Sequence, residues 1–256
     1  MMSNARSALQ ELISMSRELG RPERDLVILG EGNTSALCDD DTFWVKASGT
    51  QLRRPGVDTF VRLHLAPVCA LADGDRMSDE DFKAALNAAK VDASLEKRPS
   101  TETVLHALAL TEAGAKFVGH THPVAVNAIM CSNGVEEAFS GRLFPDEIVV
   151  CGPAPAYVPY TDPGLPLARA VRGAFHRYID EWNMPPKVIV LQNHGMIALG
   201  SSPTEVDSIT AMFVKTCRIL LGTYALGGPH FLSQANVNRI FTRPDEAYRR
   251  KELKLD

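Results

Sequence analysis

The sequence predicts an α/β protein in which helices flank a mixed β-sheet. Segments with helical apolar spacing and short apolar runs typical of strands are interspersed along the whole chain. No linker-like stretch or internal repeat interrupts them. The strands do not alternate strictly with helices, as a purely parallel sheet would require, so we expect a mixed sheet. We therefore predict one domain over residues 1–256, with a core of about 5–225 and a tail of about 228–256.

The first half of the chain begins with a helix, which Ser3 or Asn4 can cap and Gly20 can end. The sequence GEGNTS that follows a short apolar run is typical of a turn, and so is Ser48-Gly49-Thr50. The remaining elements expected here are a strand over 43–47, helices over 78–90 and from Pro99-Ser100 to Gly114, a buried strand over 116–120, and a short helix from Pro123.

The second half begins with a predicted strand over 147–151 and a segment rich in proline and glycine, which we expect to be irregular. Ser202 and Glu205 form the pattern of a capping box, which predicts the start of a long helix that reaches about Tyr224. Before it, we expect a helix over 165–182 and strands over 187–191 and 196–199 on either side of QNHG. The polar tail is expected to wrap the surface or a neighbouring subunit.

Composition and charge exclude several classes of protein. The net charge of −4 and the pI of about 6.0 argue against nucleic-acid and anionic-membrane partners, which require a basic face. Five scattered cysteines without a CxxC pair are typical of a reduced protein. The first residues lack the pattern of a signal peptide, and no apolar run is long enough to span a membrane. We expect a soluble, cytoplasmic protein.

Three histidines form the strongest candidate site. His120 and His122 end an apolar strand, and residues two apart on a strand point to the same face. His194 follows the apolar run KVIVLQ at the end of a second strand. Three imidazoles that leave a position for water or substrate are typical of catalytic zinc sites, so we predict a divalent metal, and the ligand type favours zinc. Alternatively, His120 and His122 could simply be polar residues where a strand meets a loop, and His194 could be a turn histidine that is hydrogen-bonded to the backbone.

Glu102 lies in the first turn of the helix that Pro99-Ser100 begins. A carboxylate at this position is favoured by the helix dipole, so it could simply cap the helix. Its functional alternative is a general acid/base or a fourth metal ligand that substrate displaces. His106, one turn further along, is expected to pack or to support the site instead of binding metal.

Three segments offer small residues and hydroxyls where elements begin or end. Each could be an ordinary turn or cap. Together they supply the N–H groups, hydroxyls and helix N-terminus that an anion site needs, in a protein without a basic field. Lys46 could add a charge or could face solvent. The candidate residues are Asn33, Thr34, Ser48, Gly49, Ser100 and Thr101.

Taken in order, these motifs resemble those of the class II aldolase/adducin family. GEGNTSAL resembles its GN-x-S turn, VKASGT its SG turn and RPSTETVLH its segment with the catalytic glutamate. VGHTHPVAV resembles its HxH metal motif, and LQNHGMIALG its third-histidine motif. The resemblance spans about residues 5–225, and five ordered motifs are far more specific than any one of them.

The resemblance implies a three-layer α/β/α sandwich with a central mixed sheet. It also implies that His120, His122 and His194 bind a zinc-like metal, with Glu102 as the acid/base and as a ligand in the resting state. Five residues of the anion pocket fall on positions that family members use to hold a substrate phosphate: Asn33, Ser48, Gly49, Ser100 and Thr101. Enzymes of the family are commonly homotetramers with active sites at subunit junctions, so a neighbouring copy is expected to complete the site.

The chain looks closest to the rhamnulose- and fuculose-1-phosphate aldolase-like branch, which implies cleavage of a ketose phosphate through a metal-stabilised enediolate. Asp146 or Glu147 would then be a second acid, and Tyr157, Tyr160 and Tyr224 are candidates for a catalytic tyrosine. An epimerase, a dehydratase or a 3-oxo-acid phosphate decarboxylase would use the same ligand set. A non-catalytic adducin-like module is the alternative of another class.

Overall fold

A seven-stranded mixed sheet forms the centre of the protein. The computed structural model describes residues 2–253, without the side chains of residues 2–4, so the predicted cap at Ser3 or Asn4 lies outside the described side chains. The strand order is β3-β2-β1-β4-β7-β6-β5, and every neighbouring pair is antiparallel except β5 and β6. The strands are β1 (Asn33–Leu37), β2 (Thr42–Lys46), β3 (Phe60–His64), β4 (Phe117–Thr121), β5 (Ala156–Val158), β6 (Val188–Leu191) and β7 (Gly195–Gly200).

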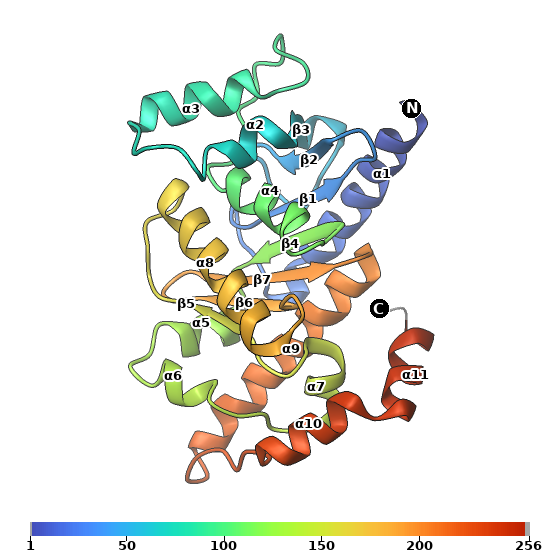
Figure 1. Cartoon of the computed structure of the whole chain (residues 1–256), viewed down its shortest axis with the longest axis vertical. Helices are drawn as coiled ribbons and strands as arrows, with labels where there is room; N and C mark the ends of the chain where they lie inside the picture. The colour runs from blue at the N-terminus through green and yellow to red at the C-terminus, as the bar shows by residue number, and fades with distance from the viewer. Residues whose placement is uncertain (1, 254–256) are drawn as a thin grey trace.

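Helices cover both faces of this sheet, which confirms the predicted three-layer sandwich. In Figure 1, α4 and α8 lie in front of the sheet, and α1 and α9 lie behind it. Successive side chains of a strand point to opposite faces, so each strand contributes to two cores. On β7, Ile197 packs with the front core and Met196 with the rear core. The helices are α1 (Met2–Leu19), α2 (Leu65–Ala70), α3 (Asp79–Ala88), α4 (Thr103–Thr111), α5 (Val124–Met130), α6 (Val135–Ala138), α7 (Pro145–Cys151), α8 (Leu165–Trp182), α9 (Pro203–Tyr224), α10 (Gln234–Thr242) and α11 (Pro244–Glu252), with single 3₁₀ turns η1 (Pro22–Arg24) and η2 (Val57–Thr59).

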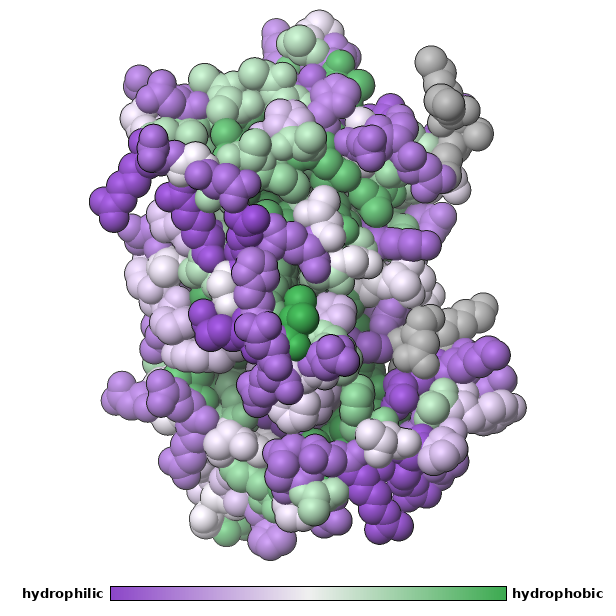
Figure 2. Space-filling model, in the orientation of Figure 1, coloured by the Kyte–Doolittle hydropathy of each residue, from purple (hydrophilic) through white to green (hydrophobic). Residues whose placement is uncertain are grey.

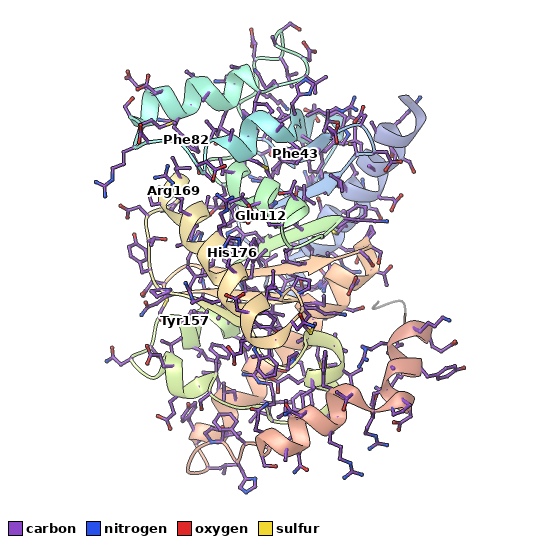
Figure 3. The ribbon with its side chains drawn as sticks, in the orientation of Figure 1. Phe43, Phe82, Glu112, Tyr157, Arg169 and His176 are labelled. Carbon is purple, nitrogen blue, oxygen red and sulfur yellow. The ribbon has the colours of Figure 1, made fainter. Side chains whose placement is uncertain are left out.

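Helix α4 is enclosed on all sides. Its residues 103–110 are all buried, because the helix lies between the sheet and α8. A helix that is apolar all round requires such an enclosed position. At its C-terminal end, Glu112 pairs with His176 of α8 at 3.1 Å, and the two side chains lie next to each other in Figure 3. This pair joins the C-terminal end of α4 to α8.

The long helix α9 begins as the capping pattern predicts. The Ser202 side chain accepts a hydrogen bond from the Glu205 N–H at 3.2 Å. The Glu205 carboxylate accepts from the Ser201 N–H and hydroxyl and also pairs with Lys187 at 2.9 Å. The glutamate thus joins the start of α9 to the start of β6, in addition to capping the helix.

The prediction of a strand over 147–151 is wrong, because these residues belong to helix α7. A short apolar run cannot be assigned to strand or helix from periodicity alone. Pro145 at the start favours a helix, and the next two acidic residues suit its first turn. The helix packs against α9 and α10, so tertiary contacts decide its conformation.

Three strands lie where we expected turns or irregular structure. β1 occupies part of the predicted GEGNTS turn, β3 lies in the stretch between residues 50 and 78 where no element is expected, and β5 occupies part of the segment rich in proline and glycine. The residues Asn33, Thr34 and Ser35 individually favour turns. They are extended here because β1 pairs with β2 on one side and with β4 on the other.

The chain continues after α9 into two further helices, α10 and α11, which pack on α7. Val237 is the buried anchor of α10, whereas α11 has no buried residue. Figure 2 shows the strongly hydrophilic surface over α11 at the lower right. The predicted polar tail is therefore helical where it is described. None of the helices described here has the length and apolar character that crossing a membrane requires.

A buried ion pair holds the start of α7. Arg142 and Glu147 are 3% and 1% exposed, and their charged groups lie 2.7 Å apart. Burial raises the pKa of Glu147, while Arg142 opposes this shift. The second carboxylate oxygen accepts the Leu143 N–H at 2.8 Å. Removal of either partner would leave the other charge buried and unpaired.

We expect Glu147→Ala to lower the free energy of unfolding by about 3–5 kcal/mol, because Arg142 loses its buried counter-charge. Asp146→Ala is the matched control, since Asp146 pairs with Arg249 on the surface at 2.7 Å. The Asp146→Ala substitution should lower the free energy of unfolding by only about 0–1 kcal/mol. Urea denaturation of the two variants measures the difference, and equal losses would show that the buried pair is no stronger than the exposed one.

Candidate active site

The first two histidines are placed by strand β4. His120 lies between Asn33 of β1 and Ile197 of β7 in the sheet. Its Nδ1 lies 2.9 Å from the Met196 carbonyl oxygen, which can only accept, so Nδ1 carries the proton. His122 follows the strand, and its N–H donates to the Leu26 carbonyl at 2.9 Å. In the neutral ring, this leaves the lone pair on the Nε2 atom of His120 as the one that can bind a metal.

His194 reaches the same place from the loop between β6 and β7. This loop holds Gln192, Asn193 and His194, and Asn193 adopts a φ of 55°, a conformation that asparagine tolerates. The Asn193 N–H donates to the Met130 carbonyl at 3.1 Å. The Asn127 side chain donates to the His194 carbonyl, also at 3.1 Å. The end of α5 thus fixes the loop that carries the third histidine.

The three imidazoles converge on one point. The Nε2 atom of His120 lies 3.0 Å from that of His122 and 3.3 Å from that of His194. Ligands placed tetrahedrally about 2.0 Å from a zinc ion lie roughly 3.3 Å from one another, so the donor set fits such an ion. Burial is the main cause that lowers the pKa of His122 to about 3 and that of His194 to about 4. Both are therefore neutral at pH 7, as metal ligands must be.

Glu102 faces the same point from the N-terminal end of α4. Its Oε1 lies 3.2 Å from the Nε2 of His194, and its Oε2 lies 3.5 Å from the Nε2 of His120. It occupies the N-cap position of α4, but its side chain makes no capping hydrogen bond. Burial raises the pKa of Glu102. The opposing effects of His120, His194 and the Asn33 amide are larger together, so the pKa falls to about 2. The geometry thus favours a functional carboxylate over a helix cap.

A chain of buried hydrogen bonds supports Glu102. The Asn33 amide donates to its Oε2 at 2.6 Å, and the Asn33 oxygen accepts from the Nε2–H of His106. Ser35 lies 2.7 Å from the Nδ1 of His106, whose pKa burial lowers to about 3. A neutral ring with a proton on Nε2 accepts at Nδ1, so Ser35 donates there. Asn33 and Ser35 share one face of β1, and Glu102 and His106 lie one turn apart, at the N-cap and within the first turns of α4.

The predicted anion-binding segments lie beside each other at one end of this site. Residues Ala47 and Pro99 form a β-bridge, and the Ser48 N–H donates to the Arg98 carbonyl at 2.9 Å. Ser48, Gly49 and Thr101 are exposed, whereas Ser100 is buried and accepts from the Asn33 amide at 3.3 Å. The turn over 48–49 and the segment that precedes α4 therefore meet next to Asn33 and Glu102. Gly49 has a φ of 77° and open space around it.

Thr34 does not belong to this group, which corrects its inclusion among the phosphate contacts. Its hydroxyl lies 2.6 Å from that of Ser16 on α1, behind the sheet. Strand alternation gives the reason, because Asn33 faces α4 and the next residue must face the opposite layer. Lys46 is buried and donates to the Gly30 carbonyl at 3.0 Å. Burial lowers the pKa of Lys46 to about 8, with Glu102 opposing the shift.

The two candidate second acids lie elsewhere in the described structure. Glu147 is bound in the buried pair with Arg142, and Asp146 pairs with Arg249 of α11. Among the described contacts, neither reaches the three histidines. The resemblance to the rhamnulose- and fuculose-1-phosphate aldolase-like branch suggested these two residues, but helix α7 places them with α10 and α11.

The candidate tyrosines are half-buried or exposed. Tyr160 donates from its hydroxyl to Asp162, and its N–H donates to Gln192 in the loop that holds His194. Tyr157 lies on β5, and Tyr224 ends α9 with 43% of its surface exposed. None of the described hydrogen bonds joins a tyrosine hydroxyl to the histidines or to Glu102.

Two glycines are required by this geometry and were not identified from the sequence. A Cβ on Gly195 would lie 2.5 Å from the Thr121 carbonyl oxygen and 2.8 Å from a ring carbon of His122. A Cβ on Gly32, where φ is 65°, would lie 2.5 Å from the His120 carbonyl oxygen. Gly195 belongs to the motif QNHG and Gly32 to GEGNTS. Their positions next to His194 and Asn33 are the only sequence feature quoted above that indicates a need for glycine.

The comparisons identify the family. The Class II Aldolase and Adducin N-terminal domain matches residues 10–221. The chain belongs to the class II aldolase/adducin family. This class II aldolase-like domain is 28% identical to the N-terminal class II aldolase domain of a conserved Thermoplasma acidophilum protein. That match has a TM-score of 0.66 and covers 83% of this chain and 93% of the other.

Two further relatives of the class II aldolase-like chain are more distant or much longer. An L-fuculose 1-phosphate aldolase is 18% identical with a TM-score of 0.68, and the match covers 92% of this chain and 94% of that one. At this identity the likeness shows the fold alone. YuxG of Bacillus subtilis, named an uncharacterized oxidoreductase, is 29% identical over 202 residues. The match covers 76% of this chain but only 27% of that protein.

We expect Gly195→Ala to reduce zinc uptake severely, because the new methyl group must displace His122 or separate β4 from β7. The same overpacking should lower the free energy of unfolding by about 1–3 kcal/mol. Gly222→Ala in α9 is the control, since its Cβ would meet no atom within 4 Å. Metal analysis after incubation with zinc and dialysis measures uptake, and a Gly195→Ala protein with full zinc content would contradict the assigned packing.

Proposed function

We propose that this protein is a metal-dependent aldolase that cleaves a ketose phosphate or a related hydroxy-carbonyl compound. The observation that carries the proposal is the convergence of three histidine Nε2 atoms and the Glu102 carboxylate on one point. Three imidazole ligands leave room for substrate, as catalytic sites require. Membership of the class II aldolase/adducin family supports the same reaction class.

We propose that His120, His122 and His194 hold a divalent metal ion, most plausibly zinc from the all-imidazole donor set. Such an ion supplies Lewis-acid stabilisation of the negative charge that develops on substrate oxygens. Glu102 is ionised at neutral pH and faces the same point, so it can accept or return a proton at the reacting carbon. Asn33 holds the carboxylate in this orientation through its amide.

The phosphate would bind at the group formed by Ser48, Gly49, Ser100 and Thr101, with Asn33 at its inner edge. This group offers hydroxyls, backbone N–H groups and the N-terminal end of α4, which favours anions. Its position beside Glu102 supports the assignment, because a substrate held there by its phosphate extends toward the histidines. Lys46 adds a buried positive charge that interacts with Glu102.

We further propose that copies of the chain assemble as a homotetramer and meet near this site. Two large apolar side chains that line the cavity beside His122 are exposed, Ile28 at 63% and Val124 at 60%, and Leu29 next to Ile28 is 77% exposed. Exposed apolar residues gathered at one place favour contact with another protein surface. A residue of the neighbouring copy could supply the tyrosine or the second acid that this chain does not place at its own histidines.

We expect Glu102→Gln to retain metal through the three histidines and to lose turnover by at least 10²-fold, because the amide cannot accept a proton. His176→Gln is the control, since that residue pairs with Glu112 on the surface. Steady-state kinetics and metal analysis of both variants test the role. Aldol cleavage at the normal rate by Glu102→Gln would disprove the assignment.

A substrate panel tests the proposed reaction directly. Zinc-loaded protein is incubated with ketose 1-phosphates, free ketoses and 3-oxo-acid phosphates, and the products are identified by NMR. Cleavage into an aldehyde and a ketone phosphate supports the aldolase, whereas epimers, dehydration products or carbon dioxide would assign the site to another reaction. Freshly purified protein that neither contains nor takes up a divalent ion would favour a non-catalytic module.

A further inference from the structure

The loop over residues 26–32 is fixed against the strand that carries two of the histidines. The His122 N–H donates to the Leu26 carbonyl at one end of the loop. At the other end, Gly32 packs so closely on the His120 carbonyl that only glycine fits. Side chains of this loop are therefore held at set positions beside the histidine pair.

Glu31 is the acidic residue of this loop, and one of its two carboxylate oxygens accepts a hydrogen bond from the loop backbone. The Ile28 N–H donates to Oε2 at 3.0 Å, and the Glu31 N–H donates back to the Ile28 carbonyl at 3.0 Å. The other oxygen, Oε1, lies 4.0 Å from the Nδ1 of His122. Both side chains line a cavity of about 360 Å³ that Asp25 and Asn127 also line.

The chemistry of a metal-binding histidine requires a partner at this position. The Nε2 of His122 faces the other histidines, so coordination there places the ring proton on Nδ1. This N–H needs an acceptor that fixes the ring orientation, and carboxylates and backbone carbonyls serve this purpose in metal sites. The Met196 carbonyl fills the role for His120. For His122, the Glu31 carboxylate is the acceptor that the described contacts offer.

We propose that Glu31 is a positioning residue that accepts the Nδ1–H of His122 and thereby orients this ring for the metal. The inference rests on the metal site proposed above. A shift of about 1 Å by the free Oε1 brings the pair to hydrogen-bonding distance. Glu31 keeps its bond to the Ile28 N–H during this shift, so the loop holds the carboxylate that orients the His122 ring.

Zinc affinity, measured by competition with a chromophoric chelator at fixed pH, tests the proposal without any substrate. Glu31→Gln keeps an oxygen for the Ile28 N–H but presents a donor toward His122. Glu31→Asp keeps the charge, but its shorter side chain cannot bind Ile28 and His122 together. Asp25→Asn is the matched control, because Asp25 lines the same cavity, loses the same charge and has a φ of 58° that asparagine tolerates.

We expect Glu31→Gln and Glu31→Asp each to weaken zinc binding about 10-fold or more, and Asp25→Asn less than 3-fold. A Glu31→Gln protein that binds no more weakly than Asp25→Asn would overturn the role. So would wild-type affinity in Glu31→Asp, since charge alone would then suffice. Thermal unfolding without zinc checks that all variants fold alike. Failure of the wild-type protein itself to bind zinc would refute the metal site, whereas a failure confined to the variants concerns Glu31 alone.

Discussion

The enclosure of α4 between the sheet and α8 is the constraint on which the site depends. Every residue from Thr103 to Leu110 is buried, so the helix cannot shift without exposing apolar surface. At about 25 cal/mol per Å², even a small displacement would be costly. Glu102 precedes the first turn of this helix and His106 lies one turn later. Hydrophobic packing therefore sets where the Glu102 backbone lies, and the Asn33 amide then orients its carboxylate beside the histidines.

Polar groups can be buried at this point because each has a complementary partner. Asn33 donates to Glu102 and accepts from His106, and Ser35 completes the sequence. A buried polar group without such a partner would cost several kcal/mol. Burial also lowers the pKa of His122 and His194, so these two rings are neutral at pH 7 and their lone pairs are available. The network thus supplies both stability and ligand chemistry from the same residues.

The sequence was sufficient for the helices with clear periodicity and for the residues that converge. Helices α8 and α9 follow the predicted bounds closely, and the three histidines and Glu102 do meet. Local patterns failed where long-range pairing decides conformation. β1 is made of residues that favour turns, so its alternation was not visible and Thr34 was assigned to the wrong face. The apolar residues of α7 predict a strand wrongly, because periodicity cannot distinguish a strand from a helix in so short an apolar run.

The role of Glu31 shows a related limit. Its neighbour Gly32 belongs to a recognisable turn motif, but nothing in the motif indicates a carboxylate beside His122. The contact arises because the loop returns to β4 after the end of α1, and only the three-dimensional arrangement reveals it. Similarly, Arg142 and Glu147 are separated by four residues in sequence, yet the turn into α7 and not their spacing brings them together.

The separation of His120 from His194 along the chain determines when the site can form during folding. They are 74 positions apart and meet only because β4 pairs with β7. The chain between two such distant residues loses conformational entropy when they meet, so we expect this contact to form later in folding than local contacts. A metal ion can therefore be bound by all three imidazoles only after β4 and β7 have paired. Such binding would stabilise the folded sheet and would not direct its formation.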